Sequence, residues 1–203
     1  MDNQAYLDQI AVKGKVKSGP ILTPFLIKII AAGIITLITM IIVGSVINAS
    51  SAKVTQSYER VYVTINTISN EESPFRVYLE KVKDSNLRSY ITTLLSSLRT
   101  TGITLEGIAP NVGINANAIT PAVRAEDDAN FYDLDDSLRD AFYTGTLDRT
   151  YAAKAYYEIS LLLSYEEAAR SKTPNQEFAN LLDQSISDLK TIQEQFKAYN
   201  ESN

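Results

Sequence analysis

The densest group of ionisable side chains is the acidic stretch EDDANFYDLDD, from Glu126 to Asp136. An EF-type calcium loop needs oxygen ligands at alternating positions, a central glycine and a closing glutamate. Asp128 and Asn130 begin such a pattern, but the stretch has neither the glycine nor the closing glutamate. Acidic side chains are also favoured early in a helix by its dipole. We therefore expect a solvated acidic helix face, with a weak cation site or a basic partner as alternatives.

Scattered glutamates could belong to a di-iron site, which uses Glu and Glu-x-x-His on facing helices. Glu158 is followed by Leu161 at the His position, and Glu80 and Glu106 have no partner at the required spacing. The sequence has no His and no Cys, which excludes serine triads, common zinc sites, thiol catalysis and iron–sulfur clusters. We expect solvated helix glutamates and no catalytic, cofactor-binding or metal-ligating residues.

Tyrosines gather in one stretch. Tyr151, Tyr156, Tyr157 and Tyr165 fall within a single predicted helix, and the spacing puts Tyr151 on its core side. Semi-buried packing is the simplest interpretation, and an aromatic contact patch is the alternative because Tyr is favoured at interfaces. The net charge of −5 argues against a nucleic-acid partner, which would select a basic face.

Hydropathy predicts a membrane segment, because no residue from Ile29 to Ala52 is charged. Roughly 20 such residues cross a bilayer core as a helix. We therefore predict three parts: a short cytoplasmic segment over 1–24, a transmembrane signal-anchor helix in the lipid bilayer over 25–49, and an extracytoplasmic helical domain over 50–203.

Lysines set the predicted orientation of that anchor. Four of them precede or begin the apolar segment: Lys13, Lys15, Lys17 and Lys28. The positive-inside tendency therefore places the N-terminus in the cytoplasm. A cleaved signal peptide is the rival interpretation, but its apolar core is usually only about 7–15 residues long. Small residues on one stripe leave a homo-oligomer of paired anchors open: Ala32, Thr36, Gly44 and Asn48.

Past the membrane segment, apolar residues recur at helical spacing in five stretches. They run from Val54 to Ile68, Leu87 to Ile108, Phe131 to Phe142 (a shorter helix), Leu147 to Leu162, and Phe178 to Phe196. No stretch alternates with the period of a strand. The domain is predicted to be all-α, most simply an antiparallel four-helix bundle.

Caps predict where these helices begin. Ser73-Pro74, Thr120-Pro121 and Thr173-Pro174 each place a hydroxyl before a first-turn proline. Thr173 to Gln176 also fits a capping box, and Asp84-Ser85 restarts a helix after a short piece that begins at Pro74. We predict that these hydroxyls cap their helices.

Three stretches carry a family resemblance. The first reads Tyr90-Ile91, Leu94, Leu98, Leu105, Ile108-Ala109 and Gly113-Ile114. The second is Gly145-Thr-Leu-Asp-Arg-Thr-Tyr151, and the third, weaker one runs from Gln176 to Ile192. Together they resemble a bacterial group of exported ferritin-like four-helix bundles without an assigned function, over most of residues 75–197. The resemblance implies ferritin-like topology.

The departures from that family carry more information than the matches. The three positions where the family tends to have His fall at Leu98, Ile159 and Ile192, all aliphatic here and all on faces that the periodicity assigns to the core. An aliphatic side chain gains roughly 1.5–3 kcal/mol on full burial and has no polar atom to satisfy. The resemblance therefore implies packing rather than metal binding at these positions.

These features predict a single-pass membrane protein that displays a ferritin-like bundle outside the cell membrane. We expect a structural or protein-interaction role in the cell envelope, an envelope protein as partner, and no catalysis. A metal-handling or oxidative-stress bundle is one alternative. The other is a ligand-sensing four-helix domain that acts through a partner, because the cytoplasmic segment leaves no room for a signalling module.

Overall fold

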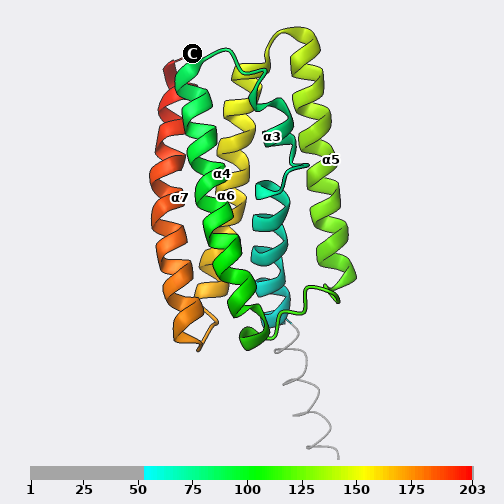
Figure 1. Ribbon diagram of the computed structural model, residues 1–203, viewed down its shortest axis with the longest axis vertical. Helices are drawn as coiled ribbons and strands as arrows, with labels where there is room; N and C mark the ends of the chain where they lie inside the picture. Colours follow the sequence, from blue (N-terminus) through cyan, green and yellow to red (C-terminus); the bar gives the residue numbers. More distant parts are fainter. Residues whose placement is uncertain (1–52, 203) are drawn as a thin grey trace, which may run out of the picture. The chain divides into compact units, whose positions relative to one another are not determined.

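The computed structural model describes residues 53–202 (Figure 1). These residues form helices joined by turns, with no strand among them, which confirms the all-α prediction for this part. A helix over 53–69 is followed by α3 (Pro74–Leu79), α4 (Ser85–Ile108), the 3-10 helix η1 (Ala109–Val112), α5 (Pro121–Thr144), α6 (Leu147–Arg170) and α7 (Gln176–Ser202).

The predicted cytoplasmic segment, 1–24, and the predicted transmembrane helix, 25–49, lie outside the described residues. Within 53–202, none of the helices combines the length and the apolar character needed to cross a bilayer.

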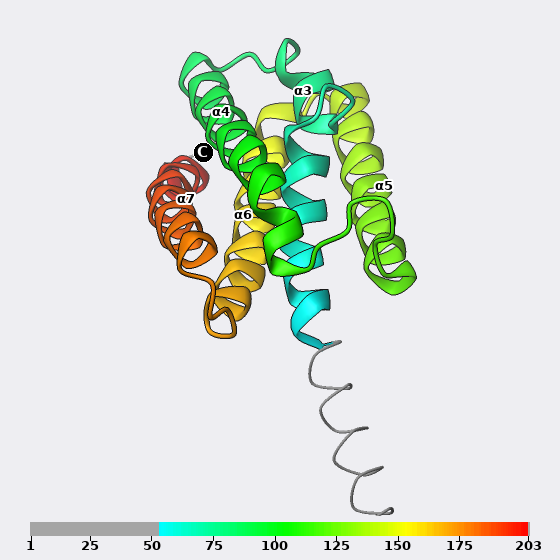
Figure 2. The ribbon, with the colours of Figure 1, turned by 60° about the horizontal axis from the view of Figure 1, so that its bottom comes forward.

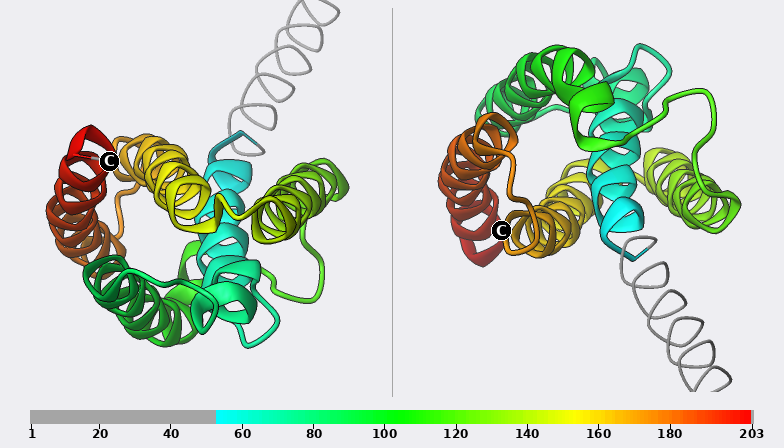
Figure 3. Two further views of the ribbon diagram at one scale, coloured as in Figure 1. Left: turned by 90° about the horizontal axis from the view of Figure 1, so that it is seen from above. Right: turned by 90° about the horizontal axis from the view of Figure 1, so that it is seen from below.

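Four elements surround one interior: helix 53–69, α4, α6 and α7 (Figure 3). Helix 53–69 and α7 run in one direction and α4 and α6 in the other, so each helix is antiparallel to its neighbours in the ring (Figure 1). The short α3 follows helix 53–69 after a turn (Figure 2). Because α4 and α6 are parallel, the chain must return between them, and α5 makes that return outside the ring, beside helix 53–69 and α6 (Figure 3). The described part is thus a ring of four long helices with one further long helix, α5, outside it, and the short α3 between helix 53–69 and α4.

The interior of the ring is apolar. Leu98, Ile159 and Ile192 are 1%, 1% and 4% exposed, which confirms the prediction that they pack in the core. Tyr151 is fully buried, as its spacing predicts, and its hydroxyl donates a hydrogen bond to the carbonyl oxygen of Phe75. These contacts bury the apolar faces that an isolated helix would leave in water.

The helices begin where the sequence predicts more often than the predicted side chains cap them. A helix restarts at Asp84-Ser85 as predicted: α4 begins at Ser85, and Asp84 Oδ1 accepts from the Leu87 N–H at 2.8 Å. Helices also begin at Pro74 and Pro121, but the hydroxyls of Ser73 and Thr120 make no capping hydrogen bond. The predicted cap of α7 at Thr173 is wrong: Asn175 Oδ1 accepts from the Phe178 N–H at 2.9 Å.

α5 differs most from its prediction. It spans 24 residues rather than the short piece expected from Phe131 to Phe142. Phe142, predicted to face the core, is 44% exposed, while Val123, Leu134 and Leu138 are buried. The first half of α5 carries few large aliphatic side chains, so its position depends on contacts with residues far away in the sequence.

Candidate functional site

A polar contact region joins α5 to helix 53–69 and α6; we call it the α5 seam. At its centre, Arg60 Nη2 donates to Glu126 Oε2 at 2.8 Å, and the Tyr165 hydroxyl donates to Glu126 Oε1 at 2.8 Å. Burial alone would raise the pKa of Glu126, but these hydrogen bonds and the charge of Arg60 together lower it. The Arg60 guanidinium also lies 5.7 Å from the centroid of the Tyr165 ring. Three elements therefore meet on one carboxylate.

Further polar contacts extend the seam along α5. The buried Glu59 accepts from the Thr120 N–H at 3.2 Å, which places a carboxylate at the N-terminus of α5, where the helix dipole favours it. The Thr67 hydroxyl donates to Asp127 Oδ2 at 2.6 Å. On the other side, Lys154 Nζ lies 2.6 Å from Asp133 Oδ2. Directional contacts thus fix both the start and the middle of α5.

A small cavity of about 20 Å³ lies inside the seam. Its lining includes two carboxylates, three hydroxyls and one amide: Asp127, Glu158, Thr64, Thr67, Ser73 and Asn130. None of the described residues that line it is basic. Ser73 is fully buried, and its Oγ has no hydrogen-bond partner within the described part of the chain. The hydroxyl that sequence analysis assigned to capping α3 lines this cavity instead.

Glu158 separates that cavity from an open groove of about 450 Å³ between α5 and α6, and it lines both, as does Asn130. Only 6% of Glu158 is exposed, so the expectation of a solvated helix glutamate is wrong for this residue. It holds for Glu80 and Glu106, which are exposed. Glu158 was misjudged because it directly precedes Ile159, at the edge of the core-facing stripe.

The charge on Glu158 is opposed by its surroundings. Burial raises the pKa of this carboxyl to about 7, Lys154 opposes the rise, and Asp133 and Asp127 add to it. Burial likewise raises the pKa of Asp127, against the hydrogen bond from Thr67. The seam therefore places two carboxylates in an environment that disfavours their negative charge.

The acidic stretch on α5 is divided between the seam and solvent. Glu126 and Asp127 turn inward, while Asp128 and Asp136 are exposed. The predicted solvated acidic face is therefore correct for the outer side of α5 and wrong for these two inward residues.

Another buried carboxyl, Glu166, was missed by sequence analysis. It is fully buried on α6 and accepts from the Ser185 hydroxyl of α7 at 2.7 Å, while its Oε2 has no hydrogen-bond partner. Burial raises its pKa to about 8, although the Ser185 hydrogen bond opposes the rise. A signal was present in the sequence, because Glu166 lies four residues after the core residue Leu162.

The motif from Gly145 to Tyr151 has a structural role. Gly145 adopts a left-handed conformation, with φ of 76°, at the end of α5. The Asp148 carboxylate accepts the backbone N–H groups of Lys83 and Asp84 at 2.8 to 3.2 Å. Together with the Tyr151 hydrogen bond to Phe75, these contacts tie the start of α6 to the α3–α4 connection.

Exposed large apolar side chains concentrate on α5 and α6. Tyr132 and Tyr143 of α5 are 67% and 78% exposed, and Tyr157 of α6 is 55% exposed. Tyr156 is 36% exposed. The prediction of semi-buried packing is wrong for Tyr157, because more than half of this residue is exposed. On α4 the corresponding exposed residue is Ile103.

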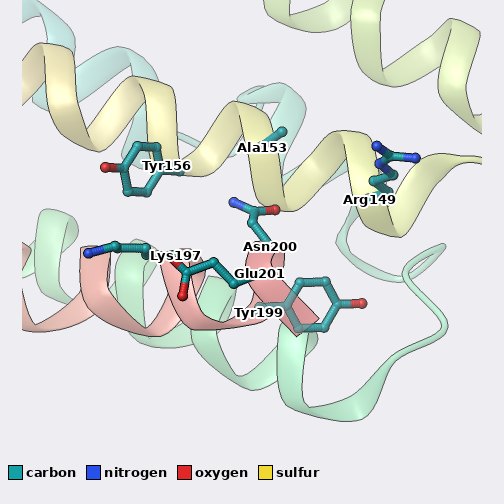
Figure 4. A pocket seen from close by; sticks show the side chains of 7 residues that line it. All are labelled: Arg149, Ala153, Tyr156, Lys197, Tyr199, Asn200 and Glu201. Atoms are coloured by element: carbon teal, nitrogen blue, oxygen red, sulfur yellow. The ribbon is translucent and has the colours of Figure 1, made fainter. Parts of the chain in front are cut away.

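A surface groove of about 400 Å³ lies between α6 and α7 (Figure 4). Arg149 and Tyr156 of α6 line it, with Lys197 and Glu201 of α7. The two cationic side chains lie at opposite ends of the view, and Asn200 turns toward α6, where its amide nitrogen lies 3.4 Å from the Ala152 carbonyl oxygen. These side chains do not converge on one point, so the groove lacks the geometry of a built ligand site.

No group of three or more Asp, Glu, His or Cys residues that could hold a metal ion occurs among residues 53–202. Comparisons of the chain with protein families, with curated proteins and with solved structures give no match.

Proposed function

We propose that this chain is a single-pass membrane protein whose helical domain binds another protein outside the membrane and catalyses no reaction. Residues 25–49 would anchor it in the bilayer, with 1–24 in the cytoplasm. The outer face of α5, formed by Asp128, Tyr132, Asp136, Arg139 and Tyr143, would be the contact surface. Its partner would be an envelope protein.

The exposure of Tyr132 and Tyr143 is the observation that carries this proposal. They are eleven residues apart, about three helical turns, so they lie on one stripe of α5. Tyrosine gives a large contact area with a polar tip and is enriched at protein interfaces. In an isolated monomer, both rings would remain largely in water.

Charge indicates the chemistry of the partner. α5 carries seven acidic side chains against two arginines. Arg139 is paired with both Asp135 and Asp136, so it does not offset the charge on the rest of the face. A partner that offers basic side chains around an apolar patch would complement this surface and be attracted to it at low salt.

Connectivity supports the proposed ferritin-like topology. Two antiparallel pairs, helix 53–69 with α4 and α6 with α7, are joined by one long crossover, and a single long crossover is typical of ferritin-like folds. The aliphatic residues at the three positions where the resembling family carries His favour packing over redox chemistry in the ring interior. Fold alone assigns no function, so the partner proposal rests on the surface of α5.

Crosslinking of the full-length chain in intact cells, followed by identification of its neighbours, tests the proposal. We expect one reproducible neighbour, which is lost when Tyr132→Ala and Tyr143→Ala are combined. Ile103→Ala is the matched control, because Ile103 is 63% exposed but lies on α4. A neighbour set that the tyrosine variant leaves unchanged, or the absence of any reproducible neighbour, would contradict the proposal. A second copy of this chain as the neighbour would make the interaction homo-oligomeric.

Orientation can be tested separately, because the sequence contains no cysteine. Single cysteines are introduced by Ser18→Cys and by Ser187→Cys, the second at an exposed position of α7. In intact cells, a membrane-impermeant thiol reagent should label the second variant and spare the first until the membrane is opened. The reverse pattern would overturn the proposed topology.

A further inference from the structure

We propose that the cavity in the α5 seam binds one calcium ion, held by the carboxylates of Asp127 and Glu158 and by neutral oxygens of Thr64, Ser73 and Asn130. The site goes beyond the proposed function, since it concerns how α5 is fixed to the bundle rather than what the outer face of α5 binds. It lies between the bundle and its crossover helix, not in the aliphatic interior of the four-helix ring.

A buried oxygen without a partner among the described residues, Ser73 Oγ, is the first observation. Ser73 is fully buried and its Oγ has no hydrogen-bond partner in the described chain, although buried polar atoms are nearly always satisfied. Glu158 is only 6% exposed, but its carboxylate oxygens are not among the fully enclosed atoms without a partner, because the residue also lines the open groove. Both line the same cavity. A cation coordinated by Ser73 Oγ and by the Glu158 carboxylate would give both groups a partner.

Charge is the second observation. Two carboxylates face the cavity, and no basic side chain among the described residues lines it. Thr67 donates a hydrogen bond to Asp127 Oδ2, which leaves Oδ1 available to a ligand. The nearest cation on the groove side, Lys154, lies 2.6 Å from Asp133. A divalent ion would balance two carboxylates, whereas a water molecule would leave their mutual repulsion in place.

Ligand type and size select calcium among the divalent ions. The potential ligands are all oxygens, which hard cations prefer, and the described part has neither the His nor the Cys that zinc sites use. The cavity of about 20 Å³ has room for about one water-sized body. Magnesium usually keeps several waters in an octahedral shell, while calcium accepts irregular sets of carboxylate, carbonyl and hydroxyl oxygens. Glu158 and Asn130 also line the open groove, so the cavity lies close to solvent.

The sequence provides no reason to expect metal ligands, because its glutamates are predicted to be solvated and neither the EF-type spacing nor the Glu-x-x-His pattern of facing helices is complete. This site draws instead on three elements: Thr64 from helix 53–69, Asp127 and Asn130 from α5, and Glu158 from α6. Ser73 comes from the turn before α3.

Calcium titration of the full-length chain, purified with chelator and then freed of it, tests the site by calorimetry and by thermal unfolding. We expect one ion per chain, a dissociation constant of about 10⁻⁵ to 10⁻³ M, and a higher unfolding temperature with CaCl₂ than with equal MgCl₂. Glu158→Gln and Asp127→Asn should each weaken binding at least about tenfold. Asp140→Asn, at an exposed position of α5 outside both the cavity and the proposed contact surface, removes the same charge and should leave calcium binding unchanged.

Ser73→Ala separates a cation site from a merely unsatisfied hydroxyl. If calcium binds here, this variant should bind the ion several-fold more weakly. In calcium-free buffer it should be at least as stable as the parent chain, because it removes a buried polar atom without a partner. No calcium binding, or binding that Glu158→Gln and Ser73→Ala both leave unchanged, would overturn the proposal. Neither result would bear on the partner-binding face, because its crosslinks are measured independently.

Discussion

The interior shared by α4, α6 and α7 and the α5 seam are built from different chemistry. In the interior, Leu98, Ile159 and Ile192 are buried and have no polar atom to satisfy. In the seam, α5 is held by directional contacts, centred on Glu126 with Arg60 and Tyr165. Burial of apolar side chains contributes much free energy and depends little on their exact position. Hydrogen bonds and ion pairs contribute less net free energy, but they require a defined geometry. The bundle interior should therefore set stability, and the seam should set where α5 lies.

Truncation in the interior should have the largest effect. Leu98→Ala removes a side chain that is 1% exposed and leaves a cavity, so we expect a loss of about 2–5 kcal/mol in the free energy of unfolding. Urea unfolding followed by circular dichroism measures it. Ile103→Ala, on the exposed side of the same helix, should change stability by less than about 0.5 kcal/mol. Equal effects at the two positions would contradict the distinction between interior and surface.

Glu166 is a carboxyl buried inside the bundle, and it predicts a pH dependence. Burial raises its pKa in the folded chain to about 8 from an ordinary value of 4.5. Between these two pH values, the folded state therefore holds a proton that the unfolded state has released. The contribution of Glu166 to stability should therefore fall as the pH rises from about 4.5 to about 8, and remain level above that.

Glu166→Gln keeps an acceptor for Ser185 and removes the titration. At pH 5 it should resemble the parent chain, whose carboxyl is protonated and has the same unpaired buried atom. At pH 9 it should be more stable by an amount on the order of a few kcal/mol. Urea unfolding at both values of pH measures the difference, and Glu106→Gln, at an exposed site on α4, should show none. A parent chain and Glu166→Gln variant that respond identically to pH would refute the assignment.

In the seam, a single change should loosen α5 without unfolding the bundle. Glu126→Gln weakens the contacts with Arg60 and Tyr165. Because Arg60 and Glu126 are 38% and 39% exposed, solvent screens their pairing and the expected cost is about 1 kcal/mol. Hydrogen exchange should become faster in α5 while α4 and α7 keep their protection. Asp183→Asn, which breaks the surface pair with Arg170, should leave α5 exchange unchanged; a uniform increase in all helices would mean that α5 is not a separate unit.

The same contrast explains what could be predicted from the sequence. The buried positions Leu98, Ile159 and Ile192 were predicted because apolar residues at helical spacing report burial directly. The burial of Glu158 and Glu166 was not predicted, since a pattern based on apolar residues assigns a glutamate to the exposed side of a helix. Yet Glu166 lies four residues after the buried Leu162, so the helical spacing places it on the core-facing side of α6.

The contacts of the α5 seam could not be predicted from local sequence patterns, for a different reason. The first half of α5 has little apolar periodicity, and its partners Glu59, Arg60 and Thr67 are about 60 residues earlier in the chain. Ser73 shows the same limit: its place before Pro74 predicts a cap, but its surroundings, which come from α5 and α6, direct it into a cavity instead. Only the folded arrangement brings these groups together.

The smallest expected effects compare two exposed glycines, one near the end of α4 and one at the end of α5. Gly145, at the end of α5, has a φ of 76°, which an L-residue adopts only with strain, whereas Gly107 lies inside α4. No atom lies within 4 Å of a Cβ added at either position, so packing contributes little and the backbone decides. Gly145→Ala should lower the free energy of unfolding by about 1 kcal/mol, and Gly107→Ala should raise it by about 0.5–1 kcal/mol. Urea unfolding resolves the two signs.

Because the Gly145 turn joins α5 to α6, strain in the Gly145→Ala variant should also speed hydrogen exchange in α5, and Gly107→Ala should leave exchange in α5 unchanged. If both alanines were stabilising, the turn would tolerate an ordinary residue, and the polar contacts of the seam alone would position α5.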